Sequence, residues 1–219
     1  MTVVAIDGPS ASGKSTVSRR VAAELDMLYV DSGALYRGVT FAAMKAGADT
    51  NDAAAVVDAM NSARFEFFVR DGGVRFSIDG VEPDMELRTA ELNHHVSPVA
   101  AVPEVRRQVT EWLRLMTGYG DLVMEGRDIG TAVFPGTEHK FYLDASAEER
   151  ARRRHSETEG TGHESSVDRI NESLKRRDRI DSTRSADPLK VAAGACILDS
   201  TTMTVEEVTS AILNKIRGL

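Results

Sequence analysis

The sequence is poor in the residues that mark secreted and membrane-spanning proteins. Cys196 is the only cysteine among 219 residues, which excludes an intrachain disulfide and a zinc site built on several cysteines. No apolar run approaches the ~20 residues needed to span a bilayer, and residues 1–6 lack the basic start of a signal peptide. We therefore expect a cytoplasmic protein with no membrane partner.

Aromatic side chains and positive charge are also scarce. Aromatic residues make up 5% of the chain, and the formal net charge is −7. Few aromatics leave few stacking platforms for bases, and an acidic surface repels phosphate backbones, so we expect no nucleic-acid partner. The length allows one large domain or two small ones. A monomer is the expected state, because no apolar segment is left over once the core is assigned.

Short apolar strands alternate with amphipathic helices along most of the chain. The strands are expected at residues 2–6, 28–30, 122–124, 141–143 and 195–198. This alternation predicts an α/β fold, a parallel sheet with helices on both faces.

Residues 64–82 interrupt this alternation. The apolar period becomes two on either side of Asp71-Gly72-Gly73, which predicts a β-hairpin. We interpret the hairpin as part of an inserted subdomain. From Ser97 the helical period returns, with Pro98 expected in the first turn of the new helix.

The first strand runs into a glycine-bearing turn typical of phosphate binding. Residues 8–15, GPSASGKS, fit G-x-x-x-x-G-K-[ST] between a strand and an amphipathic helix. Lys14 is expected to bridge the β- and γ-phosphates of a nucleoside triphosphate, and the Ser15 hydroxyl to bind Mg²⁺. The residues predicted to bind the triphosphate, ATP, are Gly8, Pro9, Ser10, Ala11, Ser12, Gly13, Lys14, Ser15 and Thr16.

The phosphate loop alone does not say what the triphosphate is used for. The only Asn-Lys pair, Asn214-Lys215, continues as Ile216-Arg217, so the N-K-x-D motif of a GTPase is absent. A helicase would need a second ATPase-like domain or a basic channel. A kinase for a small molecule or a nucleotide remains, with a non-catalytic nucleotide-binding regulator and an RNA-binding role for the arginine-rich segment as alternatives.

Three further segments place charged residues where open α/β sheets bind ligands, after the carboxyl ends of strands. Residues 31–37, DSGALYR, offer Arg37 to an acceptor phosphate, with a plain helix cap as the alternative. Residues 125–130, EGRDIG, follow the third strand, with a solvated turn as the alternative.

Residues 148–184 hold many arginines among acids, and most of these arginines should form surface ion pairs. Arg150 and Arg154 lie one helical turn apart, which predicts a lid that carries both to a transferring phosphoryl group.

Together these segments resemble the bacterial cytidylate kinases, CMP and dCMP kinases of the P-loop nucleoside monophosphate kinase superfamily. The resemblance runs nearly end to end and is most specific in residues 31–37, 126–135 and 143–150. It implies one domain with a P-loop NTPase fold over residues 1–219. The implied parts are a core of about 1–62, 96–150 and 185–219, a monophosphate-binding insert of about 63–95, and a lid of about 151–168 followed by a helix to about 184.

The resemblance also implies roles for individual residues. It implies Mg²⁺ with ATP as phosphoryl donor, and CMP or dCMP as acceptor. The residues expected to contact the acceptor's sugar and phosphate are Ser32, Arg37, Arg127, Arg177, Asp181 and Arg184. Those expected to hold cytosine are Ser97, Arg106 and Asp128, and those expected to act in phosphoryl transfer are Lys14, Arg127, Arg150 and Arg154.

Base chemistry agrees with a carboxylate at the cytosine site. Asp128 would accept from the exocyclic amino group of cytosine, whereas uracil would leave the carboxylate unpaired.

Three alternatives stay open. Ser97 precedes Pro98 and can also cap a helix. Arg106 can form a rim ion pair with Glu104 or nearby acids, and the hydroxyl for Mg²⁺ can come from Ser15 or Thr16.

Overall fold

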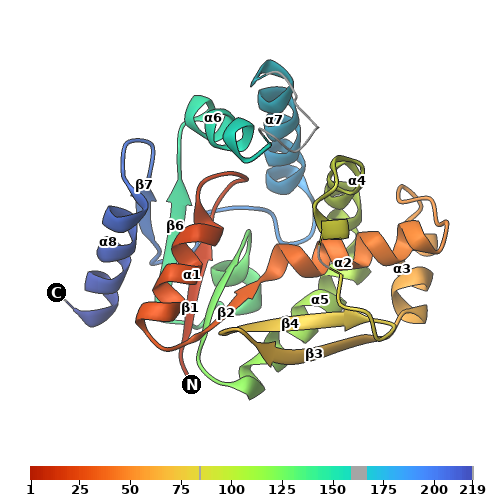
Figure 1. Cartoon of the computed structure of the whole chain (residues 1–219), viewed down its shortest axis with the longest axis horizontal. Coiled ribbons are helices and arrows are strands. Elements are labelled where there is room, and N and C mark those ends of the chain that lie inside the picture. The colour runs from red at the N-terminus through yellow and green to blue at the C-terminus, as the bar shows by residue number, and fades with distance from the viewer. Residues whose placement is uncertain (84, 159–166, 219) are drawn as a thin grey trace.

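A computed structural model of the chain describes residues 1–83, 85–158 and 167–218 (Figure 1). Within these residues, seven strands form one sheet in the order β3-β4-β2-β5-β1-β6-β7. They are β1 Val3–Asp7, β2 Leu28–Asp31, β3 Phe65–Arg70, β4 Gly73–Ile78, β5 Leu122–Gly126, β6 His139–Asp144 and β7 Cys196–Asp199. Every neighbouring pair is parallel except β3 and β4. The predicted α/β fold with a parallel sheet is confirmed.

Helices cover both faces of the sheet (Figure 1). On one face lie α1 Lys14–Glu24 and α8 Val205–Arg217. The other face carries α2 Ser32–Lys45, α3 Ala53–Ser62, α4 Ala90–Ala101 and α5 Pro103–Leu115. Val4 and Ile6 of β1 pack toward the first face and Ala5 toward the second. A strand buried on both sides therefore needs an uninterrupted apolar run.

Two further helices lie at the end of the sheet toward which β6 points (Figure 1). They are α6 Ala147–Thr158 and α7 Val167–Thr183, and they pack through Ala151, Ile170 and Leu174 against Ala11 of the phosphate loop. The glycines of the predicted lid, residues 160–162, lie outside the described residues. The remaining single-turn elements are η1 Met85–Arg88, η2 Met116–Tyr119 and η3 Ile129–Val133. In the described ranges, no helix is both long and apolar enough to cross a membrane.

The predicted hairpin is present, and it extends the main sheet. β3 and β4 pair in antiparallel fashion, and β4 pairs in parallel with β2 through Tyr29 and Gly73. A Cβ on Gly73 would lie 3.0 Å from the Tyr29 carbonyl oxygen, so glycine allows the strands to approach. Phe65 of β3 stacks on Trp112 of α5, with ring centroids 4.6 Å apart. The hairpin therefore shares both its sheet and its core with the rest of the chain.

The helix boundary near Ser97 differs from the prediction. Ser97 and Pro98 lie inside α4, whose N-terminus is capped by the Thr89 side chain, and α5 begins separately at Pro103. Pro98 removes one helical N–H, but the buried neighbours of that turn keep the helix against the core. The interpretation of Ser97 as a helix cap is therefore wrong.

Candidate active site

The phosphate loop joins the end of β1 to the start of α1. Gly8 has a φ of 152°, and a Cβ there would lie 2.0 Å from the Leu143 carbonyl oxygen, so only glycine fits. The Lys14 Nζ donates to the Pro9 carbonyl oxygen at 2.6 Å and to the Ser12 hydroxyl at 3.3 Å. The loop thus brings an ammonium group and a helix N-terminus together, an arrangement that binds phosphate.

Acidic and basic groups are buried together behind this loop. Burial and, to a lesser degree, the positive charge of Arg127 together lower the pKa of Lys14 to about 7, against the opposing charges of Glu125 and Asp7. Burial raises the pKa of Asp7 to about 6 although its carboxylate accepts from two backbone amides. Those amides belong to Ile129 and Gly130, each at 2.8 Å. Asp7 therefore fastens the segment after β5 to the end of β1.

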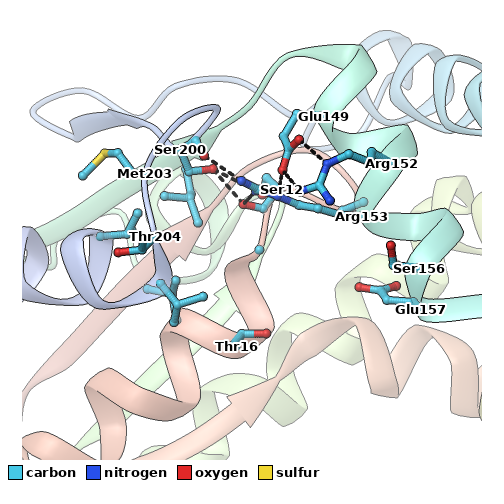
Figure 2. A pocket seen from close by; sticks show the side chains of 16 residues that line it. Ser12, Thr16, Glu149, Arg152, Arg153, Ser156, Glu157, Ser200, Met203 and Thr204 are labelled. Atoms are coloured by element: carbon cyan, nitrogen blue, oxygen red, sulfur yellow. Dashed lines mark hydrogen bonds and ion pairs between the residues drawn. The ribbon is translucent and has the colours of Figure 1, made fainter.

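A pocket of about 520 Å³ opens beside the phosphate loop (Figure 2). It lies between α6, the start of α1 and the segment that leads from β7 into α8. The Arg153 guanidinium donates to the Ser12 carbonyl oxygen at 3.1 Å, to the Ser200 carbonyl oxygen at 2.6 Å and to the Glu149 carboxylate at 2.8 Å. The volume falls within the range of small-molecule sites. This pocket can therefore hold the nucleoside of a triphosphate bound at the loop.

Four arginines from different elements gather near the end of β5. Burial, helped by the nearby charges of Arg127, Arg154 and Arg37, lowers the pKa of Arg177 to about 10. Arg127 Nε donates to Asp181 at 2.9 Å. Arg37 and Arg177 each keep a buried Nε that has no partner among the described residues. Such concentrated positive charge is stabilised by bound anions such as phosphates.

Arg150 and Arg154, the two arginines predicted to act from a lid, have different surroundings. Arg150 Nη1 donates to the Ser10 carbonyl oxygen at 3.2 Å and to Asp178 at 2.6 Å, so Arg150 fastens α6 to the phosphate loop and to α7. Arg154 forms an ion pair with Glu157 at 2.9 Å and lies near enough to Arg177 to lower its pKa. Of the two, Arg154 is the one whose charge reaches the arginine cluster.

A second buried polar cluster follows β5. Arg106 is only 1% exposed. Its Nη2 donates to the Asp128 carboxylate, and its Nη1 donates to the Ala100 carbonyl oxygen at 3.1 Å. Asp128 Oδ1 lies 3.6 Å from Arg184 Nη2. Burial raises the pKa of Asp128, whereas Arg106 and Arg184 oppose this shift. The burial of both groups excludes a solvated turn at Asp128 and a rim ion pair between Arg106 and Glu104.

Three more of the predicted acceptor-site side chains, Ser32, Ser97 and Asp181, lie around these clusters. Ser32 is buried, and its hydroxyl donates to the Glu125 carbonyl oxygen at 2.7 Å, which ties α2 to β5. Ser97 and Arg177 both line a pocket of about 280 Å³ between α4 and α7. Asp181 accepts from Arg127 and lies 3.6 Å from Arg184, so it links the two clusters.

Comparison with known proteins agrees with this geometry. The sequence model described as "Cytidylate kinase" matches residues 4–218. The chain belongs to the cytidylate kinase family. A cytidylate kinase of Geobacillus kaustophilus is 40% identical over 210 residues, which cover 96% of this chain and 94% of that protein. Another, of Mycobacterium leprae, is 41% identical over 216 residues, which cover 98% of this chain and 95% of that protein.

Membership of the cytidylate kinase family makes the chain a nucleoside monophosphate kinase, as the resemblance in the sequence implies. Among solved structures, the chain is similar to an uncharacterized protein from Eubacterium ventriosum, with a TM-score of 0.53 and 10% sequence identity. The superposition covers 100% of this chain and 99% of that one. At this identity the likeness supports the fold alone.

The kinase carries oxygen ligands suited to the Mg²⁺ that the family implies. The Ser15 hydroxyl lies close enough to the Glu125 carboxylate to lower its pKa, and the same carboxylate accepts from the Tyr29 hydroxyl. Burial and the charge of Asp31 raise the pKa of Glu125. Hydroxyl and carboxylate oxygens are the ligands that Mg²⁺ prefers, so these residues fit the ion. Thr16 lines the pocket beside the phosphate loop (Figure 2).

Among the residues that the structure describes, protein groups alone do not complete a metal site. In the part of the chain that the structure describes, no three His, Cys, Asp or Glu side chains gather as metal ligands. Mg²⁺ bound with a nucleotide takes most of its ligands from phosphates and water, so a hydroxyl and one carboxylate are a sufficient protein contribution.

Several residues of the site escape sequence reasoning. Arg153 reads as one of many charged residues on α6, and only the fold brings it to Ser12 and Ser200. Tyr36 packs its ring 5.3 Å from the Arg106 guanidinium carbon, and its buried hydroxyl has no partner among the described residues. Asp187 lies in an irregular loop, and its contact with Arg106 spans 81 positions. A motif search cannot find contacts of this range.

Proposed function

We propose that this kinase transfers the γ-phosphoryl group of ATP, bound with Mg²⁺, to the 5′-phosphate of CMP or dCMP. The products are ADP and CDP or dCDP. The observation that carries the choice of acceptor is the buried cluster of Asp128 with Arg106 and Arg184. A carboxylate accepts from the amino group of cytosine, and a guanidinium donates to its ring acceptors.

In this proposal the donor nucleotide occupies the phosphate loop and the adjoining pocket. Backbone N–H groups of residues 8–16, Pro9 excepted, hold the phosphates, and Lys14 bridges the β- and γ-phosphates. Arg153 forms one wall of the nucleoside pocket. Ser15 and Glu125 would hold Mg²⁺, which when bound draws charge from the β- and γ-phosphate oxygens.

The acceptor occupies the space between the two clusters. Its base meets Ser97, Arg106 and Asp128, and its phosphate meets the arginines. The residues assigned to the sugar and phosphate are Ser32, Arg37, Arg127, Arg177, Asp181 and Arg184. The unpartnered buried Nε groups of Arg37 and Arg177 support this assignment, because a bound phosphate would supply the missing acceptors.

The reaction needs positioning and charge neutralisation more than proton transfer. An anionic oxygen of the acceptor phosphate forms a bond to the γ-phosphorus, and the bond from that phosphorus to the β–γ bridging oxygen breaks. The attacking oxygen is already ionised at neutral pH, so no general base is required. Lys14, Arg127 and Arg154 neutralise the charge that develops, and Arg150 holds α6 on the loop.

A panel of acceptors tests this function. Steady-state rates of ADP formation are measured with CMP, dCMP, UMP, AMP and shikimate at a fixed concentration of Mg·ATP. We expect CMP or dCMP to give the highest kcat/KM. Equal or faster turnover of AMP would refute the assignment, and ATP binding without turnover of any acceptor would indicate a non-catalytic nucleotide-binding protein.

Proton uptake should accompany ATP binding. Because the pKa of Lys14 is lowered to about 7 in the free enzyme, Lys14 is neutral in most enzyme molecules at about pH 8. A bound triphosphate stabilises the ammonium form, so binding should take up about one proton per ATP. Titration calorimetry in two buffers of different ionisation enthalpy measures this number. Equal binding heats in both buffers would contradict the prediction, and Lys14→Ala should remove most of the uptake.

Arg154→Ala should lower kcat more than it raises either KM. The guanidinium lies near Arg177 and is expected to act on the transferring group, so we expect a loss of kcat of roughly ten- to a hundredfold. Steady-state kinetics with both substrates measure the effect. Arg107→Ala, an exposed arginine on α5, is the matched control. An unchanged kcat would show that Arg154 takes no part in phosphoryl transfer.

A further inference from the structure

The loop after α7 contains an aspartate in a conformation that aspartate adopts at a cost. Asp187 has a φ of 46°, in the left-handed region where glycine is the least strained residue. Its carboxylate accepts from Arg106 Nε at 3.1 Å, and its carbonyl oxygen accepts from Arg184 Nε at 2.9 Å and Nη2 at 2.6 Å. One residue thus accepts hydrogen bonds from two buried arginines of the proposed acceptor site.

These contacts determine how the arginines meet Asp128. Because Arg106 gives its Nε to Asp187 and its Nη1 to the Ala100 carbonyl oxygen, it approaches Asp128 through Nη2 alone. The two-nitrogen fork that arginine and carboxylate ordinarily form is therefore not made here. Arg184, held by the Asp187 carbonyl, stops 3.6 Å from Asp128 Oδ1, beyond hydrogen-bond distance.

One oxygen of Asp128 is consequently left with spare acceptor capacity. Oδ2 accepts from Arg106, whereas Oδ1 has a cation nearby but no hydrogen bond to it. We infer that Asp187 is a specificity-determining positioning residue, which keeps Arg106 to a single bond on Asp128 so that Oδ1 remains available to the amino group of the acceptor base. This inference rests on the proposed function, since it assumes that the base is cytosine.

The substitution that isolates the carboxylate is Asp187→Gly. Glycine adopts the left-handed conformation at least as readily as aspartate and keeps the carbonyl that holds Arg184. Only the bond to Arg106 Nε is lost, which frees Arg106 to take both oxygens of Asp128. We expect kcat/KM for CMP to fall roughly tenfold, with the KM for ATP and kcat/KM for UMP within about twofold of the unmodified enzyme.

Two matched variants separate this role from a general effect on folding. Asp187→Asn keeps an oxygen acceptor, and asparagine also tolerates the left-handed conformation. This variant should therefore retain most of the unmodified enzyme's preference for CMP over UMP. Asp71→Gly removes an aspartate with a φ of 50° from the exposed hairpin turn, and its kinetics should match those of the unmodified enzyme. If Asp187→Gly unfolds at the assay temperature, Asp187→Ser is measured instead, because its side chain is too short to reach Arg106.

The experiment compares kcat/KM for CMP and UMP, and KM for ATP, in all variants and the unmodified enzyme. The inference is supported if the ratio of kcat/KM for CMP to kcat/KM for UMP is reduced in Asp187→Gly but close to that of the unmodified enzyme in Asp187→Asn. An unchanged ratio, or a parallel loss for CMP, UMP and ATP, overturns it while the proposed function stands. An unmodified enzyme that does not prefer CMP over UMP overturns both.

Discussion

Replacing Lys14 with alanine is expected to lower kcat by at least about a thousandfold while leaving the fold intact. The ammonium group is the only lysine charge in the phosphate loop, and it lies within hydrogen-bond distance of Pro9 and Ser12. In the proposed reaction it moves onto the β- and γ-phosphates, where charge develops as the bridging bond breaks. No other side chain of α1 can supply a positive charge at that point.

The fold should tolerate the change because burying this lysine is costly. Its pKa is lowered to about 7 by burial and by Arg127, which means that the surroundings disfavour the charged form. Removing the side chain should therefore leave the melting temperature unchanged or slightly higher. Steady-state kinetics and thermal unfolding are measured together, with the exposed Lys45→Ala on α2 as control. A kcat within about tenfold of the unmodified enzyme would remove Lys14 from the transfer step.

The parts of the fold that follow local rules could be predicted from the sequence. Strand β1, the glycine-bearing loop and α1 are adjacent in the chain, and each leaves a pattern that can be read directly. The hairpin was also predictable from its period of two. Its attachment to β2 was not, because that depends on one bridge between Tyr29 and Gly73. Pro98 misled the prediction, since tertiary packing of α4 outweighs the helix-breaking tendency of one proline.

The candidate site divides in the same way. Lys14, Arg127 and Asp128 lie in runs whose spacing is informative, and the structure brings them near one another. Other contacts of the site join distant segments: Asp7 accepts from the Ile129 amide across 122 positions, and Asp187 accepts from Arg106 across 81. A sequence indicates which residue types are available for such pairs. Only the fold determines which carboxylate meets which arginine, and with how many hydrogen bonds.

Asp128→Asn is expected to lower kcat/KM for CMP by roughly a hundredfold and to change the KM for ATP by less than about threefold. The carboxamide keeps the shape of the buried side chain, but its NH₂ group would face the amino group of cytosine, a donor against a donor. The same NH₂ can donate to the carbonyl that uracil carries at that position. We therefore expect kcat/KM for UMP to rise, so that the ratio of kcat/KM for CMP to that for UMP falls by more than the roughly hundredfold loss for CMP.

Asparagine is the better test at this position because alanine would confound binding with folding. Arg106 and Arg184 are both buried beside Asp128. Alanine would leave neither with a partner oxygen at this position, at a cost on the order of 3–5 kcal/mol in folding free energy, whereas asparagine keeps an oxygen that accepts from Arg106. Kinetics with CMP, UMP and ATP are measured alongside thermal unfolding, with the exposed Asp58→Asn on α3 as control. Equal losses toward CMP and ATP would show that Asp128 does not read the base. A fall confined to CMP would assign the discrimination between the two pyrimidines to this carboxylate.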